Sequence, residues 1–125
     1  MKNETVTFDP DSFSAAWNAH DLDMIMAMSS DQCEFHASAG VEPCGTVYRG
    51  QEAVRAAYAS IFKTFPDAQW SSSRSTNVAE NRILTEWCFI ATKADGSQLK
   101  VDGLDFLEID NGKVKIKNSY RKSII

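Results

Sequence analysis

The chain has 125 residues, of which 43% are hydrophobic and 24% are charged, with a formal net charge of -4 and only three prolines. Its length fits one domain spanning residues 1–125, and its composition excludes disordered and fibrous proteins. Apart from a C-terminal run, the basic residues are scattered, so the sequence lacks the basic footprint of a nucleic-acid-binding protein.

The N-terminal stretch MKNETVTFDP lacks the apolar core of a signal peptide. No apolar run approaches the roughly 20 residues that span a bilayer, so we expect a cytoplasmic protein without membrane contact. Three cysteines, Cys33, Cys44 and Cys88, leave one unpaired in any disulfide scheme and show no CxxC spacing. Neither a disulfide scaffold nor a zinc site is expected.

Three helices are predicted in the first half of the chain. The first begins at Asp9-Pro10 and ends near His20, and Asp21 caps a short second helix over residues 22–30. The third covers residues 51–65, because its apolar residues recur at helical spacing and Pro66 ends it.

Strands are predicted over residues 32–38 and then as a meander over residues 68–78, 82–93, 101–109 and 113–122. The stretch between residues 39 and 50 is predicted as a loop. Helices followed by strands indicate an α+β domain in which the N-terminal helices pack on one side of a curved, mainly antiparallel sheet. Both faces of the sheet are partly apolar, so the outer face is predicted to contact a second subunit in a homodimer.

The strand near residue 105 carries a carboxylate on an otherwise apolar face. With a period of two, Asp105 shares its face with Val101, Gly103, Leu107 and Ile109. The same period, applied from the Asp-Asn-Gly turn onward, places Lys113, Lys115 and Lys117 on the exposed face of the last strand. The opposite, inward face is then formed by Val114, Ile116, Asn118 and Tyr120.

Three stretches, AWNAHDLDMIMAMSSDQCEFH, YRGQEAVRAAYASIF and DGLDFLEIDNGKV, resemble in this order the nuclear transport factor 2-like superfamily. That superfamily includes SnoaL-like polyketide cyclases and ketosteroid isomerases. The resemblance implies a cone-shaped α+β barrel with a pocket between sheet and helices. It also matches Asp105 to the buried acid of ketosteroid isomerases, which stays protonated and donates a hydrogen bond to the substrate oxygen.

Other catalytic positions of the resembling families are not matched. The oxygen-binding Tyr of ketosteroid isomerases corresponds to Phe13, and their base corresponds to Ala37. The acidic residue of SnoaL-like cyclases falls near Asn118, Tyr120 and Lys122. Steroid isomerisation and the usual cyclase proton shuttle are therefore not expected.

The predicted catalytic residues are Asp105, His36 and Glu86. Burial disfavours the charged form of a carboxyl group, so a protonated Asp105 can donate to a carbonyl. Alternatively, it pairs with a neighbour such as Arg74 or caps a loop amide inside the core. His36 has suitable chemistry for a base, but it alternates with Ala37 and reaches the pocket only if a bulge turns the strand. The face of Glu86 depends on the strand register. The predicted substrate-binding residues are Phe13, Trp17, Phe62, Trp87, Asn118 and Tyr120.

These residues suggest a domain that binds a small, apolar, oxygenated molecule. If it is an enzyme, we expect a cofactor-independent isomerase, cyclase or hydratase. The alternative is a non-catalytic ligand-binding or protein-interaction module of the same fold. No cofactor is expected, and no metal, because the two histidines lie sixteen residues apart without a pattern of carboxylates.

Overall fold

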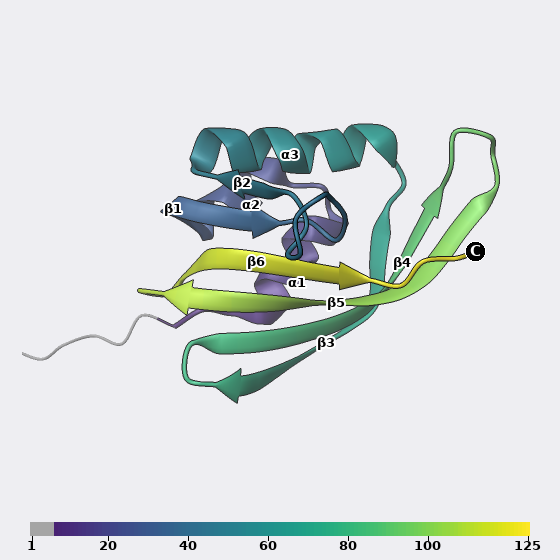
Figure 1. Cartoon of the computed structure of the whole chain (residues 1–125). Helices are drawn as coiled ribbons and strands as arrows, with labels where there is room; N and C mark the ends of the chain where they lie inside the picture. The colour runs from purple at the N-terminus through teal and green to yellow at the C-terminus, as the bar shows by residue number, and fades with distance from the viewer. Residues whose placement is uncertain (1–6) are drawn as a thin grey trace, which may run out of the picture.

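A computed structural model describes residues 7–125 of the chain. Residues 1–6, which include most of the stretch considered for a signal peptide, lie outside the described residues. Three helices precede most of a six-stranded sheet (Figure 1). The elements are α1 (Pro10–Asn18), α2 (Leu22–Ala27), β1 (Ser29–His36), β2 (Val47–Arg49), α3 (Gln51–Thr64), β3 (Gln69–Ala79), β4 (Arg82–Thr92), β5 (Gln98–Asp110) and β6 (Lys113–Arg121).

Each helix begins where the sequence predicts. The Asp9 carboxylate accepts a hydrogen bond from the backbone N–H of Asp11 at 3.1 Å, and Asp21 accepts one from the N–H of Met24 at 3.1 Å. Both caps satisfy amide groups that have no partner within the helix. The longest helix, α3, follows Gly50 and buries Val54 and Tyr58.

The strand order is β2-β1-β6-β5-β4-β3, and the only parallel pair in the described chain is β1 with β6. The meander from β3 to β6 confirms the predicted antiparallel order. The short strand β2 lies in the region predicted as a loop. It pairs with β1, with Tyr48 opposite Phe35. Figure 1 shows the sheet curving around the helices, with α3 lying along β1 and β2. The predicted α+β class, with helices packed on a curved and mainly antiparallel sheet, is confirmed.

A bulge in β6 changes which residues face the core. Ile109 pairs with Val114, but Glu108 pairs with Ile116, so Lys115 is an extra residue in β6. Each extra residue reverses the alternation of side chains along the remainder of a strand. The prediction for the last strand is therefore wrong beyond Lys115.

The inner face of the sheet now includes Lys117, which was predicted to be exposed but retains only 5% of its accessible surface. Asn118 and Tyr120 lie on the outer face, and Tyr120 is 52% exposed. In contrast, the face predicted for β5 is confirmed, because Val101, Asp105 and Leu107 are all buried there.

Aromatic side chains fill most of the space between helices and sheet. Trp17 of α1 contacts Tyr58, Phe62 and Trp70, with ring centroids 4.6, 5.3 and 5.1 Å away. Burial of such rings supplies much of the hydrophobic stabilisation of a small domain. No helix within residues 7–125 has the length and apolar character needed to cross a membrane.

Candidate functional site

Asp105 lies in the interior and is surrounded by hydrogen-bond donors. Its Oδ2 accepts a hydrogen bond from Trp87 Nε1 at 2.9 Å, and its Oδ1 accepts one from Ser119 Oγ at 2.5 Å. Lys117 Nζ lies 3.4 Å from Oδ1. All three groups are donors, so the carboxyl group of Asp105 acts as an acceptor of hydrogen bonds in this structure. The resemblance instead implies a carboxyl group that donates.

The partner of Asp105 is Lys117, whereas Arg74, the neighbour suggested from sequence, pairs with Glu86 at 3.0 Å on the outer face. The side chains of Lys117 and Asp105 are 7% and 9% exposed. Lys117 also donates a hydrogen bond to Ser119 Oγ at 3.0 Å. An ion pair this buried needs such additional hydrogen bonds to offset its desolvation.

Three aromatic rings lie near the Lys117 ammonium group. Its Nζ lies 4.5 Å from the ring centre of Trp17, 5.0 Å from that of Phe35 and 5.8 Å from that of Tyr58. Cation–π attraction holds a desolvated ammonium group in such a position. Burial raises the pKa of the Tyr58 phenol well above its usual value, with smaller contributions from Cys33 and Asp105, so Tyr58 stays neutral near pH 7.

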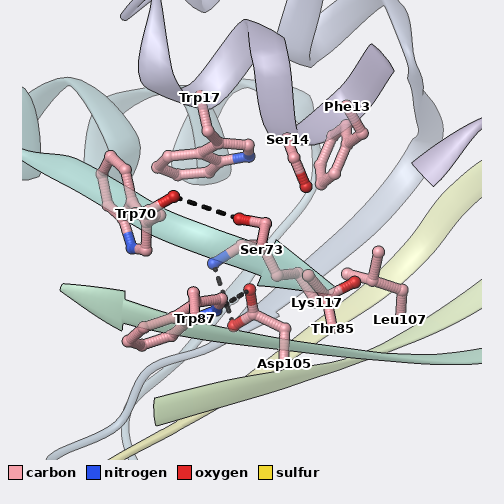
Figure 2. A pocket seen from close by; sticks show the side chains of 10 residues that line it. All are labelled: Phe13, Ser14, Trp17, Trp70, Ser73, Thr85, Trp87, Asp105, Leu107 and Lys117. Carbon is pink, nitrogen blue, oxygen red and sulfur yellow. Dashed lines mark hydrogen bonds and ion pairs between the residues drawn. The ribbon is translucent and has the colours of Figure 1, made fainter. Parts of the chain in front are cut away.

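A cavity of about 20 Å³ lies beside the ion pair, between α1 and the sheet (Figure 2). It has room for about one water molecule. Among the described residues, the Nε1 of Trp17 has no hydrogen-bond partner, and Trp17 belongs to the wall of this cavity. Its walls are formed by Phe13, Ser14, Trp17, Trp70, Ser73, Thr85, Trp87, Asp105, Leu107 and Lys117.

A larger pocket of about 290 Å³ shares Trp17, Trp70, Trp87 and Lys117 with the small cavity. Its volume lies near the lower end of the range for small-molecule sites. The shared residues link the ion pair to this pocket. Its remaining walls are Phe35, Ala37, Ser38, Ala39, Tyr48, Ala57, Ser60, Ile61, Phe65, Phe89, Ser119 and Arg121.

Three of the predicted binding residues line these cavities. Phe13 borders the small cavity, and Trp17 and Trp87 border both. Phe62 lies behind the wall, where its ring stacks on His20 with centroids 4.3 Å apart. The bulge at Lys115 turns the other two predicted residues, Asn118 and Tyr120, to the outer face.

Two of the predicted catalytic residues do not reach the pocket. His36 Nε2 lies 2.9 Å from Glu34 Oε1, while the neighbouring Ala37 borders the larger pocket as strand alternation requires. The bulge that would redirect His36 is not found there. Glu86 alternates with the inward residues Thr85 and Trp87 and is therefore on the outer face with Arg74.

The sequence reasoning missed Lys117, Ser119 and Arg121, which line the pocket from β6. The available signal was chemical: a carboxylate on an apolar face requires a charged or hydrogen-bonding partner. Asp105 pairs across the sheet with Ser119, which places this partner on the last strand.

Comparison with known structures supports this description of the fold. A candidate polyketide cyclase from Pseudomonas putida superimposes with a TM-score of 0.78, 16% identity, and coverage of 98% of this chain and 94% of that chain. A cystatin-like protein of unknown function from Xanthomonas campestris gives a TM-score of 0.79 at 16% identity, covering 91% and 88% of the two chains.

A Catenulispora acidiphila protein with a ketosteroid isomerase-like fold, solved with trimethylamine, gives a TM-score of 0.76 at 12% identity and covers 89% and 82%. Identities this low establish the fold alone. No functionally curated protein shows a significant match to the sequence. The family model for the SnoaL-like domain matches residues 11–116, and the chain therefore belongs to the SnoaL-like domain family.

Proposed function

We propose that this domain binds a small, mainly apolar, oxygenated molecule in the 290 Å³ pocket. One observation carries the proposal: a buried ammonium group, Lys117, borders this aromatic pocket and is held by Asp105 and Ser119. An ammonium group has three N–H donors. Ser119 accepts one of them and Asp105 pairs with the charge, and in this proposal another N–H donates to a ligand oxygen.

The reaction class that fits this arrangement is cofactor-independent isomerisation, cyclisation or hydration. Each of these can proceed through a carbonyl oxygen that gains negative charge when water or hydroxide in the pocket takes a neighbouring C–H proton, since the described lining holds no Asp, Glu or His. A preorganised ammonium group stabilises that charge without rearrangement of solvent. In this proposal, Lys117 contacts the oxygen, and Asp105 is a positioning residue that fixes the ammonium group.

A non-catalytic binding module is the alternative, and one observation favours it. Phe13 occupies the position matched to the Tyr that donates a hydrogen bond to the substrate oxygen, and Ala37 occupies the position matched to the base. The side chains of both residues are hydrocarbons and can neither donate a hydrogen bond nor accept a proton. Neither His36 nor Glu86 replaces the base, because both lie on the outer face. Binding without proton transfer is the outcome that this alternative predicts.

The neutral ketone 2-acetonaphthone tests the enzyme and the non-catalytic binding module as alternative functions. We expect the wild-type protein to bind it and Lys117→Met to bind it at least tenfold more weakly, because a hydrogen bond from a charged donor is worth about 1.5–3 kcal/mol. Calorimetry measures the affinity, and NMR in D₂O measures exchange of the ketone's methyl protons. Enzymatic chemistry predicts accelerated exchange that Lys117→Met removes.

The double variant Asp105→Leu/Lys117→Met serves as the control for folding, since it removes the ammonium group without leaving an unpaired carboxylate. Equal affinity of the wild type and both variants would refute the role of Lys117. Binding that depends on Lys117 without any exchange would leave the binding module as the function.

We also propose that the domain forms a homodimer through its outer sheet face. This face carries partly exposed apolar side chains on three adjacent strands, in a pattern typical of contact surfaces. They are Leu84 and Ile90 of β4, Leu104 and Phe106 of β5, and Ile116 and Tyr120 of β6.

Light scattering at micromolar concentration should give twice the chain mass of 13.9 kDa for the wild type. Leu104→Glu should give the monomer mass, because it places a charge in the middle of the apolar surface. Lys63→Glu, on the exposed side of α3, is the matched control and should remain dimeric. A wild-type monomer, or a dimeric Leu104→Glu variant, would contradict this proposal.

A further inference from the structure

The inward face of β6 carries polar groups along the length of the pocket. Lys117, Ser119 and Arg121 alternate after the bulge, and all three line the 290 Å³ pocket. Residues four apart on a strand have Cα atoms about 13 Å from each other. Lys117 is buried, whereas Arg121 is exposed, so the two cations mark the inner end and the rim of one elongated pocket.

The charges of these two cations are balanced differently. Asp105 compensates Lys117, whereas Arg121 forms no ion pair with any residue of the described chain. The walls of the pocket contain no Asp or Glu. The nearest acidic residue along β5, Asp102, alternates with inward-facing Val101 and Gly103 and is exposed on the other face. The pocket is therefore net positive, in a chain whose overall charge is -4.

Arg121 is held at the rim by an aromatic ring. Its Cζ lies 5.2 Å from the ring centre of Phe89, a buried residue that also lines the pocket. Arg121 borders a second hollow, whose walls include Lys93, Lys100 and Lys122. Clustered charges of one sign beside a pocket attract ligands of the opposite sign. The planar guanidinium group matches a carboxylate through two parallel hydrogen bonds.

We infer that the ligand of this pocket is an elongated carboxylic acid. Its carboxylate pairs with Arg121 at the rim, its flat apolar body lies between Trp87, Phe35 and Phe89, and an uncharged oxygen at its far end accepts from Lys117. This inference rests on the proposed function and adds the charge and orientation of the ligand. A neutral molecule would leave the guanidinium group unpaired.

A matched pair of probes tests the inference: 6-acetyl-2-naphthoate and its neutral carboxamide, 6-acetyl-2-naphthamide. Calorimetry on the wild type should show the acid binding at least tenfold more tightly than the amide. Arg121→Gln should reduce this preference to about twofold or less. Raising the salt concentration should weaken binding of the acid only.

Arg82→Gln is the control, because Arg82 also lies over an aromatic ring, Phe106 at 4.3 Å, yet does not line the pocket. It should keep the full preference for the acid. Equal affinity for acid and amide in the wild type, or a preference that survives Arg121→Gln, overturns the inference. Lys117-dependent binding of 2-acetonaphthone would then still uphold the proposed function. No binding of any of these probes at 1 mM would overturn both.

Discussion

Replacing Lys117 by methionine should destabilise the fold by about 3–5 kcal/mol, the usual cost of leaving one member of a buried ion pair without its partner. The Asp105 carboxylate would keep its hydrogen bonds from Trp87 and Ser119 but lose the one cation that pairs with it among residues 7–125. Methionine keeps a similar length and can still pack between Trp17 and Phe35. The loss is therefore electrostatic, and urea unfolding monitored by circular dichroism measures it.

A double-mutant cycle separates the pair from the packing around it. Asp105→Leu alone leaves an ammonium group among aromatic rings and should also cost several kcal/mol, whereas Asp105→Leu/Lys117→Met should be much more stable than the sum of the single changes implies. Coupling of at least about 2 kcal/mol is expected for neighbours in one network. Additive effects of the two substitutions would show that the charges are screened by solvent.

Gly103→Ala should destabilise the protein by about 1–3 kcal/mol through overpacking, although alanine suits a strand better than glycine. A Cβ at this position would lie 2.3 Å from Trp87 Cη2 and 2.6 Å from the backbone oxygen of Tyr120. The indole cannot simply rotate away, since its Nε1 donates to Asp105. Urea unfolding gives the loss of stability, and near-ultraviolet circular dichroism reports the displaced tryptophan.

The second substitution Trp87→Phe distinguishes a steric clash from a general weakness of the strand. Phenylalanine lacks the outer ring atoms that the new methyl group would meet, so Trp87→Phe should cost less in the Gly103→Ala protein than in the wild type. Equal costs in the two backgrounds would exclude a direct clash between residues 103 and 87.

Regular periodicity made most of the fold predictable. The helical spacing of Val54 and Tyr58 and the stop at Pro66 defined α3, and the period of two placed Asp105 on the inner face of β5. The three-residue strand β2 had no such pattern. It forms because Tyr48 pairs with Phe35 across the sheet, and pairing between distant segments is not visible in local sequence.

The site was only half predictable for the same reason. Asp105 and the wall residues Trp17 and Trp87 follow from local alternation, but the cation that compensates Asp105 depends on a register beyond the Asp-Asn-Gly turn. The prediction assumed regular alternation through Lys115, and it therefore placed Lys117 on the outer face and Asn118 on the inner face, the reverse of their positions in the structure. The residue types in β6 do not indicate the bulge, because a lysine fits an exposed position in a regular strand as well as the extra position of a bulge.

The bulge at Lys115 therefore decides which side chains of β6 line the 290 Å³ pocket. With Lys115 accommodated outside the ladder, the lining presents an amine, a hydroxyl and a guanidine. If Lys115 instead occupied a regular position in the ladder, the same stretch would present isoleucine, an amide and a phenol. A one-residue shift in the pairing of this hairpin would thus exchange a polar lining for a largely apolar one without any change in the sequence.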